Sequence, residues 1–190
     1  MAENWAEAEQ AVLQVNLPPA DYPLFDRDNQ GTSEQKNRLA ASVANGDKLF
    51  HGSIANCFSC HGAAATGDGQ SKNFDAWTKD WTEGLDPLDR QQIRPLLKLG
   101  ALKPSYILPR NLRNGVFRGG SKPSDLYLRI VNGIDGTPMP AAPLKPDNPL
   151  GLSTEEVWDL VNYLLSLPHQ YASSSASATS IAPTNTLEAK

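Results

Sequence analysis

The sequence predicts an all-α domain in which helices alternate with loops. Residues 34–50 and 153–167 each repeat apolar side chains on one helical face, which is typical of helices that pack on a core. Residues 121–132 have the start and stop signals of a third helix. No segment alternates as a half-buried strand would, and 190 residues are enough for one hydrophobic core. We therefore expect one mostly helical domain.

The helix expected over residues 34–50 places Leu39, Val43 and Phe50 on one face. Gly46 lies within it, at a point where a second helix could approach closely. A shorter helix is expected over residues 91–99, where Pro95 interrupts the pattern.

The later helices have clearer boundaries. For residues 121–132 we expect Ser121 as the N-cap, Pro123 in the first turn and Gly133 at the end. For residues 153–167, Ser153 and Glu156 form a capping box. Pro168 is expected to stop that last helix, because proline has no amide hydrogen to donate.

The composition changes at both ends of the chain. Residues 1–36 are polar and irregular, and we expect an N-terminal arm packed on the surface of a domain that spans residues 37–170. In residues 171–190, Ala, Ser and Thr make up 13 of the 20 positions. So little apolar surface cannot offset the cost of ordering, which predicts a disordered tail or a linker.

The charge balance excludes several classes of protein. The chain has 17 Lys and Arg against 21 Asp and Glu, a formal net charge of -4. A general binder of nucleic acid or anionic membranes would need a basic surface. No apolar run is long enough for a transmembrane segment, and the first residues lack the features of a signal peptide. We expect that any export signal or membrane anchor lies outside this sequence.

The most informative motif is Cys57-Phe58-Ser59-Cys60-His61. Two thiols at this spacing can each form a thioether with one vinyl group of a single haem, and the adjacent imidazole then becomes an axial ligand of the iron. The motif therefore predicts one covalently bound haem c, held by Cys57 and Cys60, with His61 as a metal ligand.

Other interpretations of the two cysteines remain open at this point. A thioredoxin-like redox pair would follow a strand in a β-α-β unit, whereas this motif follows a predicted helix. A zinc site would need a second ligand pair, and His51, His61 and His169 are poorly spaced for one. A haem-free interaction domain is the third alternative.

Met139 is the candidate for the second axial ligand. It is the only methionine besides Met1, and it stands between two prolines in a predicted loop. A core-filling methionine would instead belong to an apolar face. A thioether favours ferrous iron, and a six-coordinate iron has no vacant position for a substrate. The alternative is a bis-histidine site that uses His51.

Four segments, taken in order, resemble the class I cytochromes c. They are Gly46-Asp47-Lys48-Leu49-Phe50, the haem motif with Gly62, Pro109-Arg110-Asn111-Leu112, and Gly136-Thr137-Pro138-Met139-Pro140 before an aromatic-bearing helix. The resemblance covers residues 37–170, and residues 117–133 are similar to bacterial mono-haem cytochromes in particular. It implies the cytochrome c fold, with helices and loops around one covalent haem.

The resemblance also implies roles for single residues around that haem. The carbonyl of Pro109 would accept the free ring N–H of His61. Thr137 would donate to a haem propionate. Gly46 would let the first and last helices cross closely, against Trp158 or Tyr163. Further cofactor-binding residues are expected in the segment after Pro109 and just beyond it: Arg110, Asn111 and Arg118, with Arg113 as another cation for a propionate.

The chain departs from the compact members of this family in one long insert. His61 and Pro109 are 48 positions apart, which leaves residues 67–106 without a counterpart. Trp77 and Trp81 lie in this insert, and they either shield a haem edge or pack in a satellite cluster.

The function that this resemblance implies is one-electron transfer by a haem with His and Met ligands. The chain would be a periplasmic electron carrier or the haem domain of a larger redox protein, rather than an enzyme itself, and its partners would be redox proteins. The periplasm is expected because bacteria attach haem c in the export compartment. The alternative is a haem peroxidase, or a gas or redox sensor, with a displaceable sixth ligand.

Overall fold

The computed structural model describes residues 22–26, 28, 31–69, 73–75, 78, 84–86, 88–145 and 147–178, the last eight by their backbone only. The two tryptophans of the insert, Trp77 and Trp81, and residues 179–190 lie outside the described residues, as do residues 1–21, 27, 29 and 30 of the predicted N-terminal arm. Helices dominate the described part, as the sequence predicts.

The first described helix, α2, spans Ser33–His51 and therefore begins within the range predicted as the arm. Thr32 caps it: the Thr32 hydroxyl accepts from the amide of Gln35, and the Gln35 side chain accepts from the amide of Thr32. Gly52 ends the helix. Before residue 28 the structure describes residues 22–26, which contact the last helix: Phe25 N donates to Asn162 Oδ1, and Asn162 Nδ2 donates to the carbonyl of Pro23, each at 2.8 Å.

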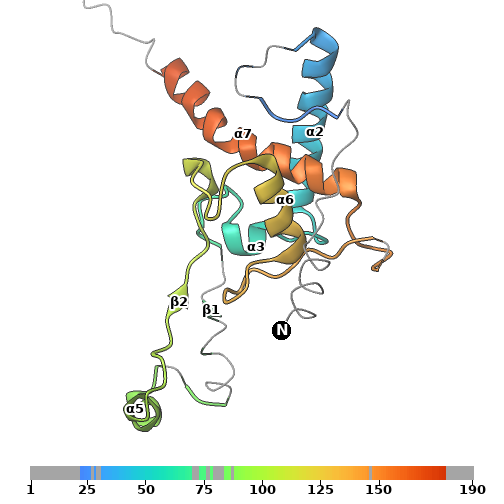
Figure 1. The fold of residues 1–190 in the computed structure, drawn as a ribbon. Helices are drawn as coiled ribbons and strands as arrows, with labels where there is room; N and C mark the ends of the chain where they lie inside the picture. The colour runs from blue at the N-terminus through green and yellow to red at the C-terminus, as the bar shows by residue number, and fades with distance from the viewer. Residues whose placement is uncertain are drawn as a thin grey trace, which may run out of the picture.

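The last helix, α7, spans Thr154–Ala178 and crosses α2 (Figure 1). The predicted capping box is confirmed: Ser153 N donates to Glu156 Oε2 at 2.7 Å, and Glu156 N donates to Ser153 Oγ at 3.2 Å. A Cβ atom on Gly46 would lie 2.1 Å from the carbonyl oxygen of Asp159 and 2.7 Å from Cβ of Tyr163. The predicted close crossing is confirmed at Tyr163 and Asp159 rather than at Trp158.

Two predictions about the end of α7 are wrong. The helix continues through Pro168, and residues 171–178 of the predicted tail are helical. A proline removes one backbone hydrogen bond, here to the carbonyl of Leu164, but its fixed φ is compatible with a helix. The Pro168 ring lies against the small turn at Gly115, where an added Cβ atom would be 3.0 Å from Cγ of the proline.

The helix α6, Pro123–Asn132, packs against α7. Its N-cap is Lys122 and not Ser121: Lys122 N donates to Asp125 Oδ2 at 3.2 Å, so the first turn satisfies its own amide. Gly133, with φ +69°, follows the last turn as predicted.

The hydrophobic core lies where α2, α6 and α7 meet. Trp158 is 1% exposed and stacks on Tyr127 of α6, with ring centroids 4.8 Å apart. Phe50, at the end of α2, is equally buried and lies against Tyr163 of α7. The core therefore joins the end of α2, which precedes the haem motif, to the last helix.

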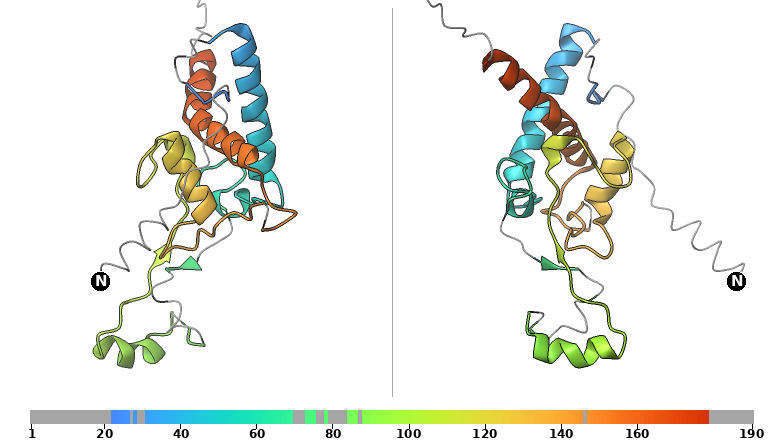
Figure 2. Two further views of the ribbon diagram at one scale, coloured as in Figure 1. Left: turned by 45° about the vertical axis from the view of Figure 1, so that its right-hand side comes forward. Right: turned by 90° about the vertical axis from the view of Figure 1, so that its left-hand side faces the viewer.

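The insert forms a projection away from this core (Figures 1 and 2). Two short antiparallel strands, β1 (Asn73–Phe74) and β2 (Tyr106–Ile107), form its root, which the sequence pattern did not predict. Near its tip lies α5, Arg90–Lys98, close to the predicted range. Among the described residues, no helix combines the length and the apolar character needed to cross a bilayer.

Candidate functional site

One helical turn carries the two cysteines and the histidine of the motif. The short helix α3 spans Phe58–His61, and Cys57 is its N-cap. His61 N donates to the carbonyl of Cys57 at 2.9 Å, so Cys57 and Cys60 lie on one face of the turn. Both thiols are free and half-buried. Burial raises the pKa of the Cys57 thiol to about 11, so that it is protonated at neutral pH.

The motif follows α2 and leads into a loop, rather than forming part of a β-α-β unit. Glycines fold this loop back on the turn: Gly69 N donates to the carbonyl of Cys60 at 3.1 Å, and Gly62 takes φ +78°. A Cβ atom at Gly69 would lie 2.3 Å from the carbonyl oxygen of Cys60, so the tight return requires glycine there.

The imidazole of His61 is oriented by a backbone carbonyl. Its Nδ1 lies 3.1 Å from the carbonyl oxygen of Arg110, and burial of the ring lowers the pKa of His61. A neutral imidazole that donates from Nδ1 carries its lone pair on Nε2. Nε2 is thereby the nitrogen that could bind a metal.

The predicted partner of His61 was wrong by one residue. The carbonyl of Pro109 instead faces Gly67: a Cβ atom on Gly67 would lie 2.4 Å from the Pro109 oxygen. Because Gly67 has no side chain, the segment Pro109–Arg110 can approach the loop after His61. The carbonyl of Arg110 then reaches the imidazole ring of His61.

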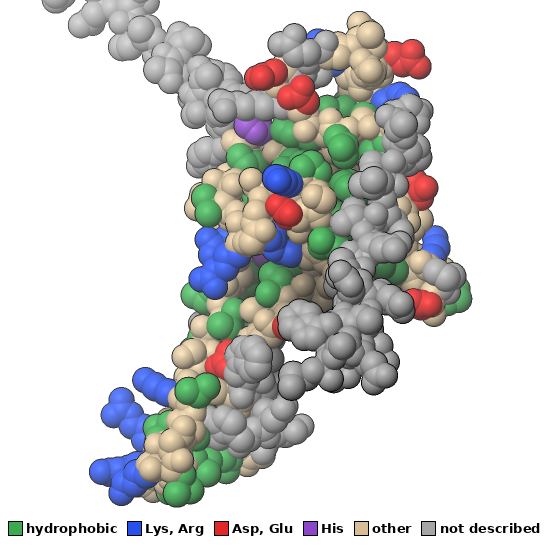
Figure 3. Space-filling model, viewed as in Figure 1, with side chains coloured by type: hydrophobic (Ala, Val, Ile, Leu, Met, Phe, Trp, Pro, Cys, Tyr) green, Lys and Arg blue, Asp and Glu red, His purple; other side chains and the backbone are tan. Residues whose placement is uncertain are grey.

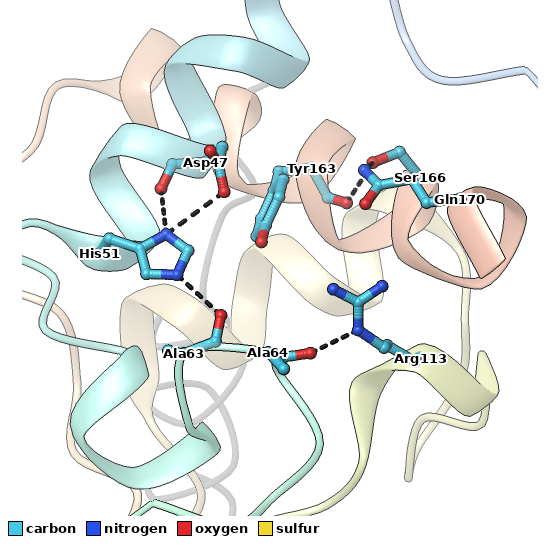
Figure 4. A network of polar contacts seen from close by, with 8 residues as sticks. All are labelled: Asp47, His51, Ala63, Ala64, Arg113, Tyr163, Ser166 and Gln170. Atoms are coloured by element: carbon cyan, nitrogen blue, oxygen red, sulfur yellow. Dashed lines mark hydrogen bonds and ion pairs between the residues drawn. The ribbon is translucent and has the colours of Figure 1, made fainter. Parts of the chain in front are cut away.

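The residues that follow Arg110 are held against the loop after His61. Asn111 Oδ1 accepts from Arg113 N at 3.0 Å and caps the single turn η1, Leu112–Asn114. Leu112 N donates to the carbonyl of Ala65 at 2.9 Å, and Arg113 Nε donates to the carbonyl of Ala64 (Figure 4). The sequence singled out Asn111 and Arg113, but as haem-binding residues and not for these structural bonds.

The loop that carries Met139 is closed by its own hydrogen bonds. Ile134 N donates to the carbonyl of Met139 at 3.1 Å. Thr137 Oγ1 donates to the carbonyl of Ile134 at 2.8 Å and accepts from Met139 N at 3.2 Å. The predicted contact between Thr137 and a haem propionate stays a prediction.

Met139 itself is half-buried. The pairing of Met139 with His61 stays a prediction, as do propionate contacts of the exposed side chains of Arg110 and Arg118.

His51 is held at the end of α2 by both of its ring nitrogens (Figure 4). Nδ1 lies 2.9 Å from the carbonyl oxygen of Asp47 and 3.3 Å from its carboxylate, and Nε2 lies 2.9 Å from the carbonyl oxygen of Ala63. These contacts raise the pKa of His51, the bond to Ala63 most of all. The geometry gives His51 a structural role and does not favour the bis-histidine alternative.

These residues fit a covalently held haem. Two thiols on one face of a turn can form two thioethers, and the neighbouring imidazole is oriented by a carbonyl, as metal-binding histidines usually are. Among the residues that the structure describes, no three His, Cys, Asp or Glu side chains converge as a protein-only metal site.

Comparison with protein families agrees with this chemistry. The sequence model of the Cytochrome c family matches residues 43–168, well over half of the chain. A solved chain of the reducing HAO-like protein complex of Kuenenia stuttgartiensis is similar at 26% identity over 82% of this chain, with a TM-score of 0.48. This chain spans about half of that one, 49% of its length. No curated protein matches.

Proposed function

The chain belongs to the cytochrome c family, and from this premise we propose that it transfers single electrons with His61 and Met139 as the two iron ligands. The family binds one haem c covalently, and Cys57 and Cys60 have the spacing for it. The haem supplies reversible one-electron chemistry when bound. The residues of the chain provide attachment, ligand choice and burial.

The observation that carries this proposal is the bond between His61 Nδ1 and the carbonyl of Arg110. The carbonyl fixes the tautomer and the plane of the ring, so that Nε2 faces one direction. A hydrogen bond at Nδ1 also makes Nε2 a stronger electron donor. Burial of the His61 ring also favours metal binding, because it disfavours the protonated imidazolium, which cannot bind a metal.

Met139 is proposed as the other ligand because its loop is ordered without using its side chain. The bonds among Ile134, Thr137 and Met139 are made by backbone atoms and by the Thr137 hydroxyl. The thioether sulfur of Met139 therefore remains available to bind the iron. As a soft ligand, it favours ferrous over ferric iron. With both axial positions filled, electron transfer is supported over substrate activation.

We further propose that the chain works in the periplasm with redox proteins as donor and acceptor. It acts there as a carrier or as the haem domain of a larger redox protein. Covalent attachment of haem c takes place in the export compartment of bacteria, which supports this location.

The absorption spectrum of the ferric holo-protein tests the ligand set. Wild-type protein should show the methionine–iron charge-transfer band at the red end, and Met139→Ala should lose it. The exposed neighbour offers a control, because Pro140→Ala keeps the thioether and should keep the band. A high-spin spectrum in the wild-type protein would overturn the proposal in favour of a peroxidase or a sensor.

A further inference from the structure

The second half of the insert concentrates positive charge on an otherwise acidic chain, whereas residues 67–87 hold two basic and five acidic residues. Residues 88–108, called the projection below, hold four of the 17 basic residues and one of the 21 acidic residues. The remaining residues hold 13 basic and 20 acidic side chains. The projection therefore has the opposite sign of charge to the body that carries the haem motif.

The basic residues of α5 form one stripe. Arg90, Arg94 and Lys98 follow each other at intervals of four, so they share a face of the helix, and all three are exposed. Among the described residues none of the three makes an ion pair. Figure 3 shows Lys and Arg side chains gathered at this end of the molecule.

Leucines are exposed along the same projection. Leu99 is 85% exposed, and Leu102 and Leu108 are each 68% exposed. Leu88 and Leu97 are exposed as well. Isolated exposed leucines are ordinary, but five within 21 residues, beside a stripe of cations, are typical of a surface that becomes covered by a partner.

The root of the projection is firmly organised. The carboxylate of Asp75 accepts from Ser105 N at 3.0 Å, from Thr78 N at 3.0 Å and from Thr78 Oγ1 at 2.8 Å. Phe74 of β1 stacks on Tyr106 of β2, with centroids 4.2 Å apart. An element that is already ordered loses less conformational entropy when it binds.

The root also joins the haem-binding turn directly. On one side, Gly69 bonds to the carbonyl of Cys60, and on the other, Arg110 follows β2 by three positions and bonds to His61. A partner that engages the projection would thus be brought to the part of the body that carries His61.

We propose that the projection is a docking element that inserts into an acidic, apolar-lined cleft of the protein that exchanges electrons with this chain. The inference rests on the proposed electron-transfer function. The cations would steer the approach toward acidic groups, and the leucines would supply the buried area.

The distribution of these residues favours a protein over a membrane. A helix that lies on a bilayer presents its apolar side chains on one face. Here Leu99, Leu102 and Leu108 lie outside α5, along the extended return to the body, so a cleft around the projection would cover more of them. An anionic bilayer would also repel the acidic body.

A second copy of the chain is a less suitable partner for the projection. Of the two hollows described on the body, one is lined by both Arg38 and Asp159, and the other by Lys36 and His169. Neither hollow is lined mainly by carboxylates, which a partner of the basic stripe would need.

The first experiment places a photo-reactive benzoylphenylalanine in the holo-protein, in place of Leu99, and irradiates it in periplasmic extract of the source organism. Leu150 of the body, 77% exposed, is the matched control position. Mass spectrometry identifies the cross-linked protein, which is then purified. We expect a redox protein captured at position 99 and not at position 150.

The second experiment measures the affinity of that purified protein for charge-reversed holo-proteins. The triple variant Arg90→Glu, Arg94→Glu, Lys98→Glu should bind about tenfold more weakly or worse. Lys36→Glu, Lys48→Glu, Lys145→Glu makes the same charge change on exposed body positions and should bind nearly as wild type does. Leu99→Ser with Leu102→Ser should weaken binding even at about 0.5 M salt, where charge is screened.

Several outcomes would overturn the docking proposal. In the cross-linking experiment, these are no captured protein at position 99, equal capture at positions 99 and 150, and capture of a second copy of the chain. In the binding experiments, they are an unchanged affinity of the projection variants, and binding of the projection to phosphatidylglycerol vesicles in place of any protein. Every variant is also checked for its haem spectrum and its reduction by ascorbate. A wild-type protein that ascorbate cannot reduce would count against the electron-transfer function itself, independently of docking.

Discussion

The Nδ1 atom of His61 lies 3.1 Å from the carbonyl oxygen of Arg110, 49 positions later in the chain. The whole projection is inserted between these two residues. The cost of closing a loop rises only slowly with its length, so a long insert is tolerated when its two ends are held together. Here the pairing of β1 with β2 and the bonds to Asp75 hold them. The insert can therefore have its own function without disturbing the haem-binding turn.

The double variant Cys57→Ala, Cys60→Ala should lack covalent haem and lose most of its helical circular dichroism. Burying a few hundred Å² of haem surface at about 25 cal/mol per Å² contributes several kcal/mol to folding, as an upper bound. The double variant loses this contribution. Mass spectrometry checks for the absent haem, and a thermal melt checks for lost cooperativity.

Ser121→Ala is the control for this experiment, because Ser121 is exposed and does not cap α6. It should match the wild-type protein in mass increment, spectrum and melting temperature. A double cysteine variant that melts as the wild-type protein does would show that the haem is not central to the fold.

Gly46→Ala should destabilise the protein, although Gly to Ala is favourable at most exposed helical positions. The added Cβ atom would meet the carbonyl oxygen of Asp159 at 2.1 Å, which is backbone and cannot turn away. We expect a loss of about 2 kcal/mol or more, and hence a melting temperature lower by roughly 5 °C or more.

The control for Gly46 is Ala44→Val on the exposed side of the same helix. It adds more atoms than Gly46→Ala does, yet it should cost well under about 1 kcal/mol. An equal loss at both positions would mean that the effect is not specific to the crossing with α7.

The parts of the fold that the sequence predicted are those that depend on local patterns. The capping box at Ser153 and Glu156 and the periodicity of residues 34–50 each predicted a helix that is present. The attachment turn was likewise predicted from spacing alone. The boundaries that depend on tertiary contacts were missed: α7 continues past Pro168, where the ring packs on the turn at Gly115.

The partner of His61 was missed by one residue for a similar reason. A sequence motif names Pro109 and Arg110 equally well, and only the close approach of Gly67 decides which carbonyl faces the ring. The role of Thr137 also depends on the path of its loop, because its hydroxyl either turns back to Ile134 or faces outward. Such details follow from packing over long separations, which periodicity cannot predict.

His51→Gln should reduce stability at acidic pH more than at alkaline pH. Each ring nitrogen of His51 faces a carbonyl oxygen, so both bonds form fully only when both nitrogens carry hydrogen. The pKa of His51 is raised in the folded state, and its stabilisation is therefore complete below its ordinary value near 6.5 and is lost as pH rises through the folded value.

The measurement is the melting temperature of the holo-protein between about pH 5 and pH 8. A cation at the end of a helix contributes up to about 1 kcal/mol, so the variant should melt about 2–4 °C lower at the acidic end and approach the wild-type protein at the alkaline end. His169→Gln changes an exposed histidine and is the control. A difference that grows with pH would contradict the assignment.

Tyr22→Phe should destabilise the protein at neutral pH, with an effect that fades in alkali. The Tyr22 hydroxyl lies 3.0 Å from Ser42 Oγ and donates to the carboxylate of Asp159, which also accepts from Asn45 at 2.5 Å. These bonds hold the segment before α2 on the crossing of α2 and α7. Loss of one such bond costs about 1 kcal/mol.

The alkaline behaviour follows from the direction of the tyrosine pKa. Burial, and then the hydrogen bond to Asp159, raise the pKa of Tyr22 above its ordinary value near 10. Between that value and the folded one, the unfolded chain releases a proton that the folded chain keeps, so wild-type stability falls as pH rises. Phenylalanine has no proton to lose, and denaturant unfolding from about pH 7 to pH 11 should show the gap between variant and wild type closing. Tyr106→Phe, at an exposed position, should leave the wild-type profile unchanged. A constant gap for Tyr22→Phe would mean that its phenol titrates in the folded protein as it does in the unfolded chain.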